Sequence, residues 1–173
     1  MKTLTLNLKK DLIIEAVKAD TFQKGQIDKA ADPIKNSPLA YNEQAGDEVY
    51  QERKLLRTLR SALAKFEANM AEYVDSAAGT INDDLSASSD DIHITISVSD
   101  RYNSGLAKPI SSLAEEYIVN MMIYTWWQPI NPNLAKDYLS FAQDSLMHTR
   151  LCLAKTAPQA SSSSYADVTG TIV

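Results

Sequence analysis

The sequence predicts a mainly α-helical protein: an antiparallel helical bundle with a long heptad helix, a C-terminal helical hairpin and a few short strands. Residues 112–153 have the periodicity of two amphipathic helices joined by a short proline-containing link. Residues 47–75 keep a heptad repeat of apolar side chains. Alternating segments at 3–8 and 92–98 supply the strands.

Length and composition set the organisation. The chain has 173 residues, 45% of them apolar, and a formal net charge of −5. We expect one helical domain at 1–157 with an extended N-terminal strand, and a flexible serine-rich tail at 158–173. The negative charge argues against nucleic-acid binding driven by overall charge. The N-terminus lacks the apolar stretch of a signal peptide, and residues 117–127 are too few to cross a bilayer, so no membrane association or secretion is expected.

The chain begins with a segment, residues 3–8, in which apolar and polar residues alternate as in a strand. A short helix is expected to follow at about 9–19. Gly25 leaves open whether 21–32 adds a helical turn or two, and turn-forming residues predict a loop at 33–46.

The longest helix is expected at 47–75, with Glu52 as the one polar residue in its heptad seam. This pattern is typical of a helix that packs in coiled-coil fashion against another, in the same subunit or a neighbouring one. The two apolar lines are Val49, Leu56, Leu63 and Met70, and Leu59, Phe66 and Tyr73.

Arginines line another face of this helix, at Arg53, Arg57 and Arg60. Such a stripe could contact DNA phosphates, which requires only positive charge within reach. Because Glu48 and Glu52 lie one turn away, a solvated, salt-bridged face is the favoured interpretation, and contact with DNA in a channel is the alternative.

An acidic, serine-rich connection at 82–91 leads into the second strand. Its aspartates could in principle hold calcium, but they lack the central glycine and closing glutamate of an EF-hand loop, so a solvated loop is favoured. In 92–98 apolar residues fill alternate positions, which predicts a strand with one buried face and His93 on the other.

Local signals bound the helical hairpin. Ser112 and Glu115 have the form of a capping box that starts the first helix, and Pro129 ends it. Asn131 is placed as the N-cap of the second helix, with Pro132 at its first position. The inward side of the second helix is expected to be Leu134, Tyr138, Phe141 and Ser145, with Leu139, Ala142, Leu146 and Leu153 beside them.

Trp126 and Trp127 end the first hairpin helix. Consecutive helical residues point about 100° apart, so the two cannot both lie centrally in one narrow seam. One could complete the core while the other faces a partner. That both finish a wide core is an equally supported interpretation.

Catalytic and metal-binding patterns are not evident. His93 and His148 lack a partner at metal-ligand spacing, and Glu115 and Glu116 are adjacent rather than opposed across a cleft. Cys152, the only cysteine, has no activating neighbour in sequence. We therefore expect a protein that is not an enzyme and holds no metal or cofactor.

A resemblance adds to these patterns. A strand ending in Val-Ser-Asp-Arg-Tyr, then Leu-Ala-Glu-Glu-Tyr-Ile-Val-Asn-Met-Met-Ile-Tyr-Thr-Trp-Trp, then Asn-Pro-Asn-Leu-Ala-Lys-Asp-Tyr resembles the head-to-tail connector proteins of tailed bacteriophages. More narrowly, it is similar to the ring or adaptor proteins of crAss-like phages. The similarity covers about the last hundred residues before the serine-rich tail, and it is a pattern rather than a diagnostic motif.

This resemblance implies a structural subunit that forms a homo-oligomeric ring in the virion neck, made in the host cytoplasm. The portal protein and neighbouring neck or tail proteins would be its partners, and DNA would pass through without sequence-specific contact. Subunits of such rings exchange extended termini, which implies interfaces at one end through Leu4, Leu6 and Leu8, and at the other through Val168, Ile172 and Val173. The alternative is a small helical protein-binding or regulatory module that recognises a partner through Trp126 or Trp127.

Overall fold

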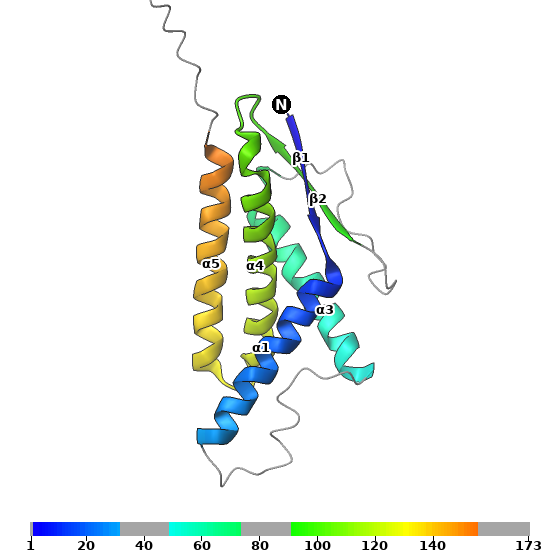
Figure 1. The fold of residues 1–173 in the computed structure, drawn as a ribbon, viewed down its shortest axis with the longest axis vertical. Coiled ribbons are helices and arrows are strands. Elements are labelled where there is room, and N and C mark those ends of the chain that lie inside the picture. Colours follow the sequence, from blue (N-terminus) through cyan, green and yellow to red (C-terminus); the bar gives the residue numbers. More distant parts are fainter. Residues whose placement is uncertain (1, 32–48, 74–90, 156–173) are drawn as a thin grey trace, which may run out of the picture.

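The computed structural model describes residues 2–31, 49–73 and 91–155. This part of the chain is mainly helical and carries one two-stranded antiparallel sheet (Figure 1). The elements in chain order are β1 (Lys2–Leu8), α1 (Lys10–Ala31), α3 (Val49–Asn69), β2 (Ile92–Val98), the 3₁₀ turn η1 (Ser104–Leu106), α4 (Ala107–Trp127) and α5 (Pro132–Ala154).

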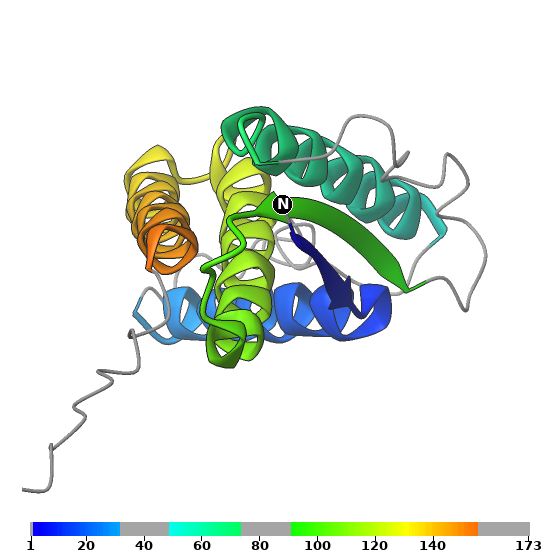
Figure 2. The same ribbon diagram turned by 90° about the horizontal axis from the view of Figure 1, so that it is seen from above.

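Helix α4 is the centre of the fold. It contacts α1, α3, α5 and β1, and the view from above shows it with α5 on one side and α1 and α3 on others (Figure 2). Nine of its residues are buried, and they lie on several faces of the helix. A helix that is apolar on most sides is stable only when neighbours cover it. Helix α4 is therefore covered by the rest of the fold on most of its sides.

Helices α4 and α5 form the predicted hairpin, running antiparallel through a link at 128–131 (Figure 1). The Asn131 cap is confirmed, because its side-chain oxygen accepts a hydrogen bond from the Leu134 N–H at 3.2 Å. The Ser112 capping box is wrong, because α4 already begins at Ala107. Pro109 is tolerated in this first turn, where its missing N–H needs no intrahelical partner.

The sheet joins the two predicted strands within one chain. Leu6 lies opposite Ile94 and Leu8 opposite Ile92, and all four side chains are buried. His93 is exposed on the opposite face, as expected, with its Nδ1 2.7 Å from the Asn7 side-chain oxygen. The strand period of two therefore separates an apolar face, which joins the helical core, from a polar outer face.

Helix α1 extends to Ala31. The predicted end near residue 19 is too early, and the helical turns that the sequence left open at 21–32 continue the same helix. Its buried line is Ile13, Val17 and Thr21, spaced four residues apart. The Thr21 hydroxyl donates to the Val17 carbonyl at 2.8 Å, so a polar residue is buried without an unsatisfied hydrogen bond. This local bond lets α1 bury Thr21 on its inward side.

Helix α3 is shorter than predicted and is followed by a turn that reaches Tyr73. Leu55 and Ala62, which lie outside the heptad seam, are buried, while Leu56 is only half-buried. The buried face is thus wider than a coiled-coil seam. Helices α1 and α3 also cross α4 obliquely (Figure 1), so neither the regular antiparallel bundle nor the heptad packing is confirmed.

Side-chain hydrogen bonds tie the helices together. The Tyr138 hydroxyl on α5 donates to the Asp20 carboxylate on α1. The Asn69 side chain on α3 lies 3.3 Å from the Tyr117 hydroxyl on α4. The Arg150 guanidinium donates to the Asn69 carbonyl, which lies at the end of α3 where carbonyls lack helical partners. Both ends of α5 are therefore fixed to other elements.

Candidate functional site

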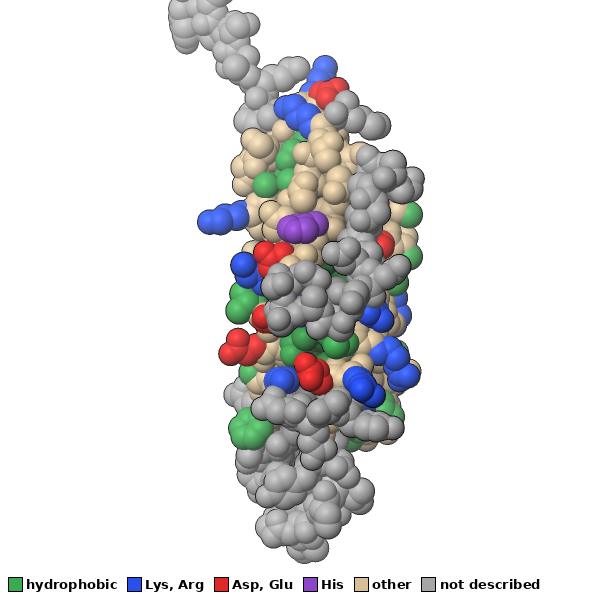
Figure 3. Space-filling model, turned by 90° about the vertical axis from the view of Figure 1, so that its right-hand side faces the viewer, with side chains coloured by type: hydrophobic (Ala, Val, Ile, Leu, Met, Phe, Trp, Pro, Cys, Tyr) green, Lys and Arg blue, Asp and Glu red, His purple; other side chains and the backbone are tan. Residues whose placement is uncertain are grey.

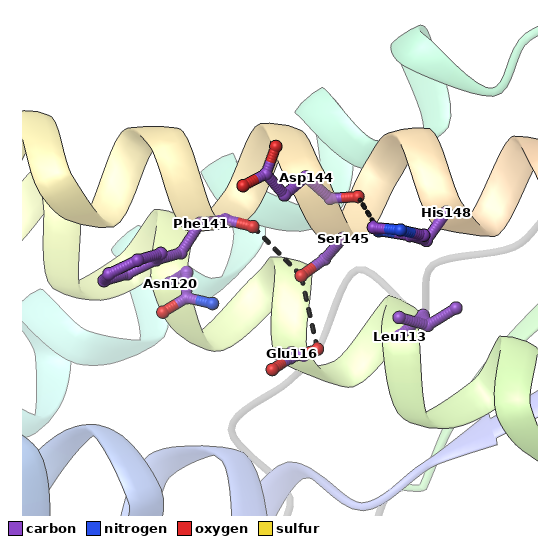
Figure 4. A pocket seen from close by; sticks show the side chains of 7 residues that line it. All are labelled: Leu113, Glu116, Asn120, Phe141, Asp144, Ser145 and His148. Carbon is purple, nitrogen blue, oxygen red and sulfur yellow. Dashed lines mark hydrogen bonds between the residues drawn. The ribbon is translucent and has the colours of Figure 1, made fainter.

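A groove of about 310 Å³ opens between α4 and α5; we call it the hairpin groove (Figure 4). Residues at helical spacing on each helix bring their side chains to its two walls. Its lining consists of Leu113, Glu116 and Asn120 from α4 and Phe141, Asp144, Ser145 and His148 from α5.

Negative charge dominates this groove. Two carboxylates, Glu116 and Asp144, belong to its lining, and no Lys or Arg is among the described residues that line it. The Ser145 hydroxyl lies 3.3 Å from a Glu116 oxygen and 3.0 Å from the Phe141 carbonyl. The His148 ring is 2.9 Å from the Asp144 carbonyl, so it turns back along its own helix. In the part of the chain that the structure describes, neither carboxylate has an ion-pair partner.

Helix α5 also exposes large apolar side chains, which we call the α5 outer face: Phe141, Met147 and Leu151. Their exposed fractions are 53%, 52% and 52%. The expectation that Phe141 faces inward is wrong; its ring meets the Tyr138 ring edge-on at 6.1 Å, at the side of the groove.

The buried side of α5 explains this error. It is made mainly of small or hydroxyl-bearing residues, which let α5 approach α4 closely, and their hydroxyls bond within the helix, as Thr149 does to the Ser145 carbonyl at 2.8 Å. Sequence analysis placed Tyr138, Ala142, Ser145 and Leu153 correctly on the inward side, but it placed Phe141 there too and so missed the groove. The inverted pattern, with small residues inward and Phe, Met and Leu outward, is the signal that could have found it. The buried residues are Ala135, Tyr138, Ala142, Ser145, Thr149 and Leu153.

The arginines predicted to line one face of the long helix, Arg53, Arg57 and Arg60, are all exposed on α3. Figure 3 shows Lys and Arg side chains gathered on the side of the molecule where α3 lies. Among the described residues, Arg53 and Arg57 make no ion pair, including with Glu52. Glu52 therefore does not support the interpretation that these arginines form a salt-bridged surface. Glu48, the other glutamate in that interpretation, lies outside the described residues.

Lys54 behaves differently from the arginines beside it. Its ammonium nitrogen lies 3.9 Å from the centre of the Trp126 ring, a cation–π contact. Burial lowers the pKa of Lys54, and the nearby Arg57 charge lowers that pKa further. Lys54 thus covers the core, while Arg53 and Arg57 remain available on the surface.

A second cavity, of about 410 Å³, lies where β2 and α5 end. Tyr102 lines it and is buried, and its hydroxyl has no hydrogen-bond partner among the described residues. Burial raises the pKa of Tyr102, with a further contribution from Cys152. Tyr73 and Lys155, the last described residues of their segments, also line this cavity.

The residues predicted to form an N-terminal interface occupy the core instead. Leu6 and Leu8 are fully buried, and Leu4 is partly buried. The reason is that β2 of the same chain supplies the strand edge that β1 needs. The prediction that these leucines reach a neighbouring subunit is wrong for this structure.

Both tryptophans are also core residues. Trp126 is 2% exposed and Trp127 is not exposed at all. The interpretation that both complete a wide core is confirmed, and neither is available to bind a partner. The alternative function, a protein-binding module that recognises a partner through Trp126 or Trp127, is therefore left without its proposed contact residues.

Other predicted features lie outside the described residues. These are the C-terminal interface candidates Val168, Ile172 and Val173, the tail at 158–173, and the acidic loop except for Asp91. Asp91 forms an ion pair with Lys9 at 3.6 Å, which joins the start of β2 to the start of α1.

Comparisons with known proteins give no relative. The chain matches no known protein family, and no characterised protein or solved structure is detectably similar to it. Within residues 2–31, 49–73 and 91–155, no group of three or more His, Cys, Asp or Glu side chains is arranged to hold a metal ion. No helix in that part of the chain is both long and apolar enough to cross a membrane.

Proposed function

We propose that this protein is a structural subunit of a phage virion neck, which assembles into a ring below the portal and surrounds the DNA channel. The observation that carries the proposal is the α5 outer face: Phe141, Met147 and Leu151 are each about half exposed on one peripheral helix. The sequence of the α4–α5 hairpin resembles connector proteins, which suggests that the partner of this surface is another subunit of a neck ring.

The α5 outer face is suited to association. Met147 and Leu151 lie four residues apart and so are neighbours on the surface of α5. Exposed apolar side chains that lie together indicate a contact site, whereas single ones are ordinary on a protein surface. Burying the exposed half of each of these side chains would contribute about 1 kcal/mol. Three such contributions favour association only together with further contacts, so we expect an interface wider than these residues.

A ring follows if α5 contacts a different surface on the next copy. Repeating such a head-to-tail contact about an axis closes into a ring when the rotation permits. Because DNA passing through a neck needs only weak, non-specific contact, an acidic subunit with a net charge of −5 is compatible with this role.

Native mass spectrometry of the full chain, with negative-stain images of the same sample, tests the proposal. We expect a closed ring of one high copy number, either in the free protein or when it is mixed with portal-bearing phage heads. A protein that remains monomeric or dimeric in both samples and does not bind the heads would overturn the neck proposal.

The C-terminal segment provides a separate test of the ring. If residues 161–173 clamp a neighbouring subunit through Val168, Ile172 and Val173, deleting Ser161–Val173 should weaken assembly and leave the unfolding transition of the domain unchanged. Circular dichroism measures the transition, and native mass spectrometry measures assembly. Equal assembly by the truncated protein would exclude the clamp.

A further inference from the structure

We propose that the hairpin groove binds the arginine-bearing face of α3 from a second copy of this chain. This inference rests on the proposed ring and names the two surfaces that meet in it. We call the second surface the α3 cationic face; it consists of Arg53 and Arg57. The sequence-based alternative, that these arginines face DNA, becomes an outcome of the test.

The groove has the chemistry that recognises a guanidinium group. Glu116 and Asp144 supply carboxylate oxygens, which arginine binds through paired, charge-assisted hydrogen bonds. Phe141 supplies an aromatic ring, half exposed, on which a planar guanidinium can stack. Neither carboxylate has an ion-pair partner among the described residues, so a cation from outside would find both unneutralised.

The α3 cationic face matches the groove in charge and spacing. Arg53 and Arg57 are exposed and lack ion pairs among the residues that the structure describes. Four residues apart on a helix, they are separated by about 6 Å along its axis. On the α4 wall of the groove, Glu116 and Asn120 are also four residues apart, and they offer a carboxylate and an amide oxygen as acceptors.

One copy cannot make this contact with itself. The hairpin groove lies between α4 and α5, whereas α3 packs on another side of α4 (Figures 2 and 4). The two complementary surfaces therefore face different directions on one molecule. A surface that is complementary to a different surface of the same protein produces the head-to-tail contact that a ring requires.

Charge reversal tests the contact in the full chain. Variant A carries Arg53→Glu and Arg57→Glu, and variant B carries Glu116→Arg and Asp144→Arg. We expect each variant alone to self-associate at least tenfold more weakly than wild type. We expect the equimolar mixture to recover association, because the introduced glutamates of variant A then meet the introduced arginines of variant B, and the native arginines of variant B meet the native carboxylates of variant A. Lys2→Glu with Lys108→Glu makes the same charge change as variant A at exposed sites away from both surfaces, and we expect wild-type association.

Unchanged association of variants A and B would overturn the proposal, as would a mixture no stronger than either variant alone. If variant A forms normal rings but no longer retains DNA, the arginines face DNA. The proposed contact between α3 and the groove is then wrong, whereas the ring proposal is still supported. Variants that no longer give the wild-type circular dichroism spectrum are replaced by the neutral pairs Arg53→Gln with Arg57→Gln and Glu116→Gln with Asp144→Asn.

Disulfide cross-linking detects the contact between α3 and the groove even if no closed ring forms. In a Cys152→Ser background, Arg57→Cys protein is mixed with Asp144→Cys protein and gently oxidised at high concentration. We expect a disulfide-linked dimer of the two variants in clear excess over a control mixture of Lys2→Cys and Asp144→Cys. Equal yields would overturn the contact. A specific dimer without any ring would support the contact and contradict the neck proposal.

Discussion

Helices α4 and α5 are neighbours in the chain and nearly equal in length, at 21 and 23 residues, yet they use their apolar residues in opposite ways. Helix α4 buries large side chains, including both tryptophans, on several faces. Helix α5 buries mainly small residues against α4 and exposes Phe141, Met147 and Leu151.

This comparison separates residues that stabilise the fold from residues that are free to make contacts. Burial in α4 removes apolar surface from water within one molecule. The exposed residues of α5 gain little from folding, because about half of each side chain remains in water. We propose that these exposed residues contact a second copy of the chain.

The largest expected effect is on the α4 side. Trp127→Ala should lower the free energy of unfolding by about 3–5 kcal/mol, because it leaves a large cavity in the core. Phe141→Ala on α5 should lower it by less than about 1 kcal/mol, since its ring is half exposed. Urea unfolding followed by circular dichroism measures both, and similar losses would remove the contrast between the two helices.

A smaller effect is expected where α5 joins α1. Tyr138→Phe removes the hydrogen bond to Asp20 and should cost about 1–2 kcal/mol at pH 7. Burial raises the pKa of Tyr138, and the Asp20 carboxylate raises that pKa further. The stabilisation is thus present below the unfolded tyrosine pKa of about 10 and is lost as pH rises above it.

The difference in unfolding free energy between wild type and Tyr138→Phe should therefore shrink between pH 9 and 11. Urea unfolding across that range measures it. A difference that stays constant would mean that this hydroxyl does not titrate as its buried site beside a carboxylate requires.

The start of α5 should show a loss of about 1 kcal/mol. Asn131→Ala removes the side-chain acceptor for the Leu134 N–H. Asn131→Asp, which keeps an acceptor at the N-cap, should restore most of the loss. If both variants were as stable as wild type, the cap would have no role in holding the hairpin.

The local elements of the fold were predictable because their signals are short in range. Alternation predicted the strand at 92–98, and the Asn131–Pro132 pair predicted the start of α5. The pairing of β1 with β2 was not predicted, because nearly ninety residues separate the strands and nothing local specifies it. The inward position of Thr21 in α1 was not predicted, because its hydroxyl is satisfied by a bond within the helix that hydropathy does not register.

The candidate site was harder to predict for a physical reason. The hairpin groove depends on which side of α5 faces α4, and the sequence places apolar residues on both sides. The fully buried positions of α5 carry mainly small residues, and Phe141 lies half exposed at the surface. The arginines were identified from sequence, but the lack of ion pairs of Arg53 and Arg57 among the described residues required the structure.

The most direct test of the account compares two sets of exposed apolar residues. One variant carries Phe141→Ser, Met147→Ser and Leu151→Ser on α5; its control carries Leu12→Ser and Phe22→Ser on α1, which are similarly exposed. Surface changes of this kind should alter the unfolding free energy by only about 0.5 kcal/mol each. By native mass spectrometry, in the sample in which wild type assembles (free protein or protein mixed with portal-bearing heads), we expect the control to form the ring as well and the α5 variant to remain monomeric. A ring formed equally well by the α5 variant would contradict the claim that this helix is the assembly surface.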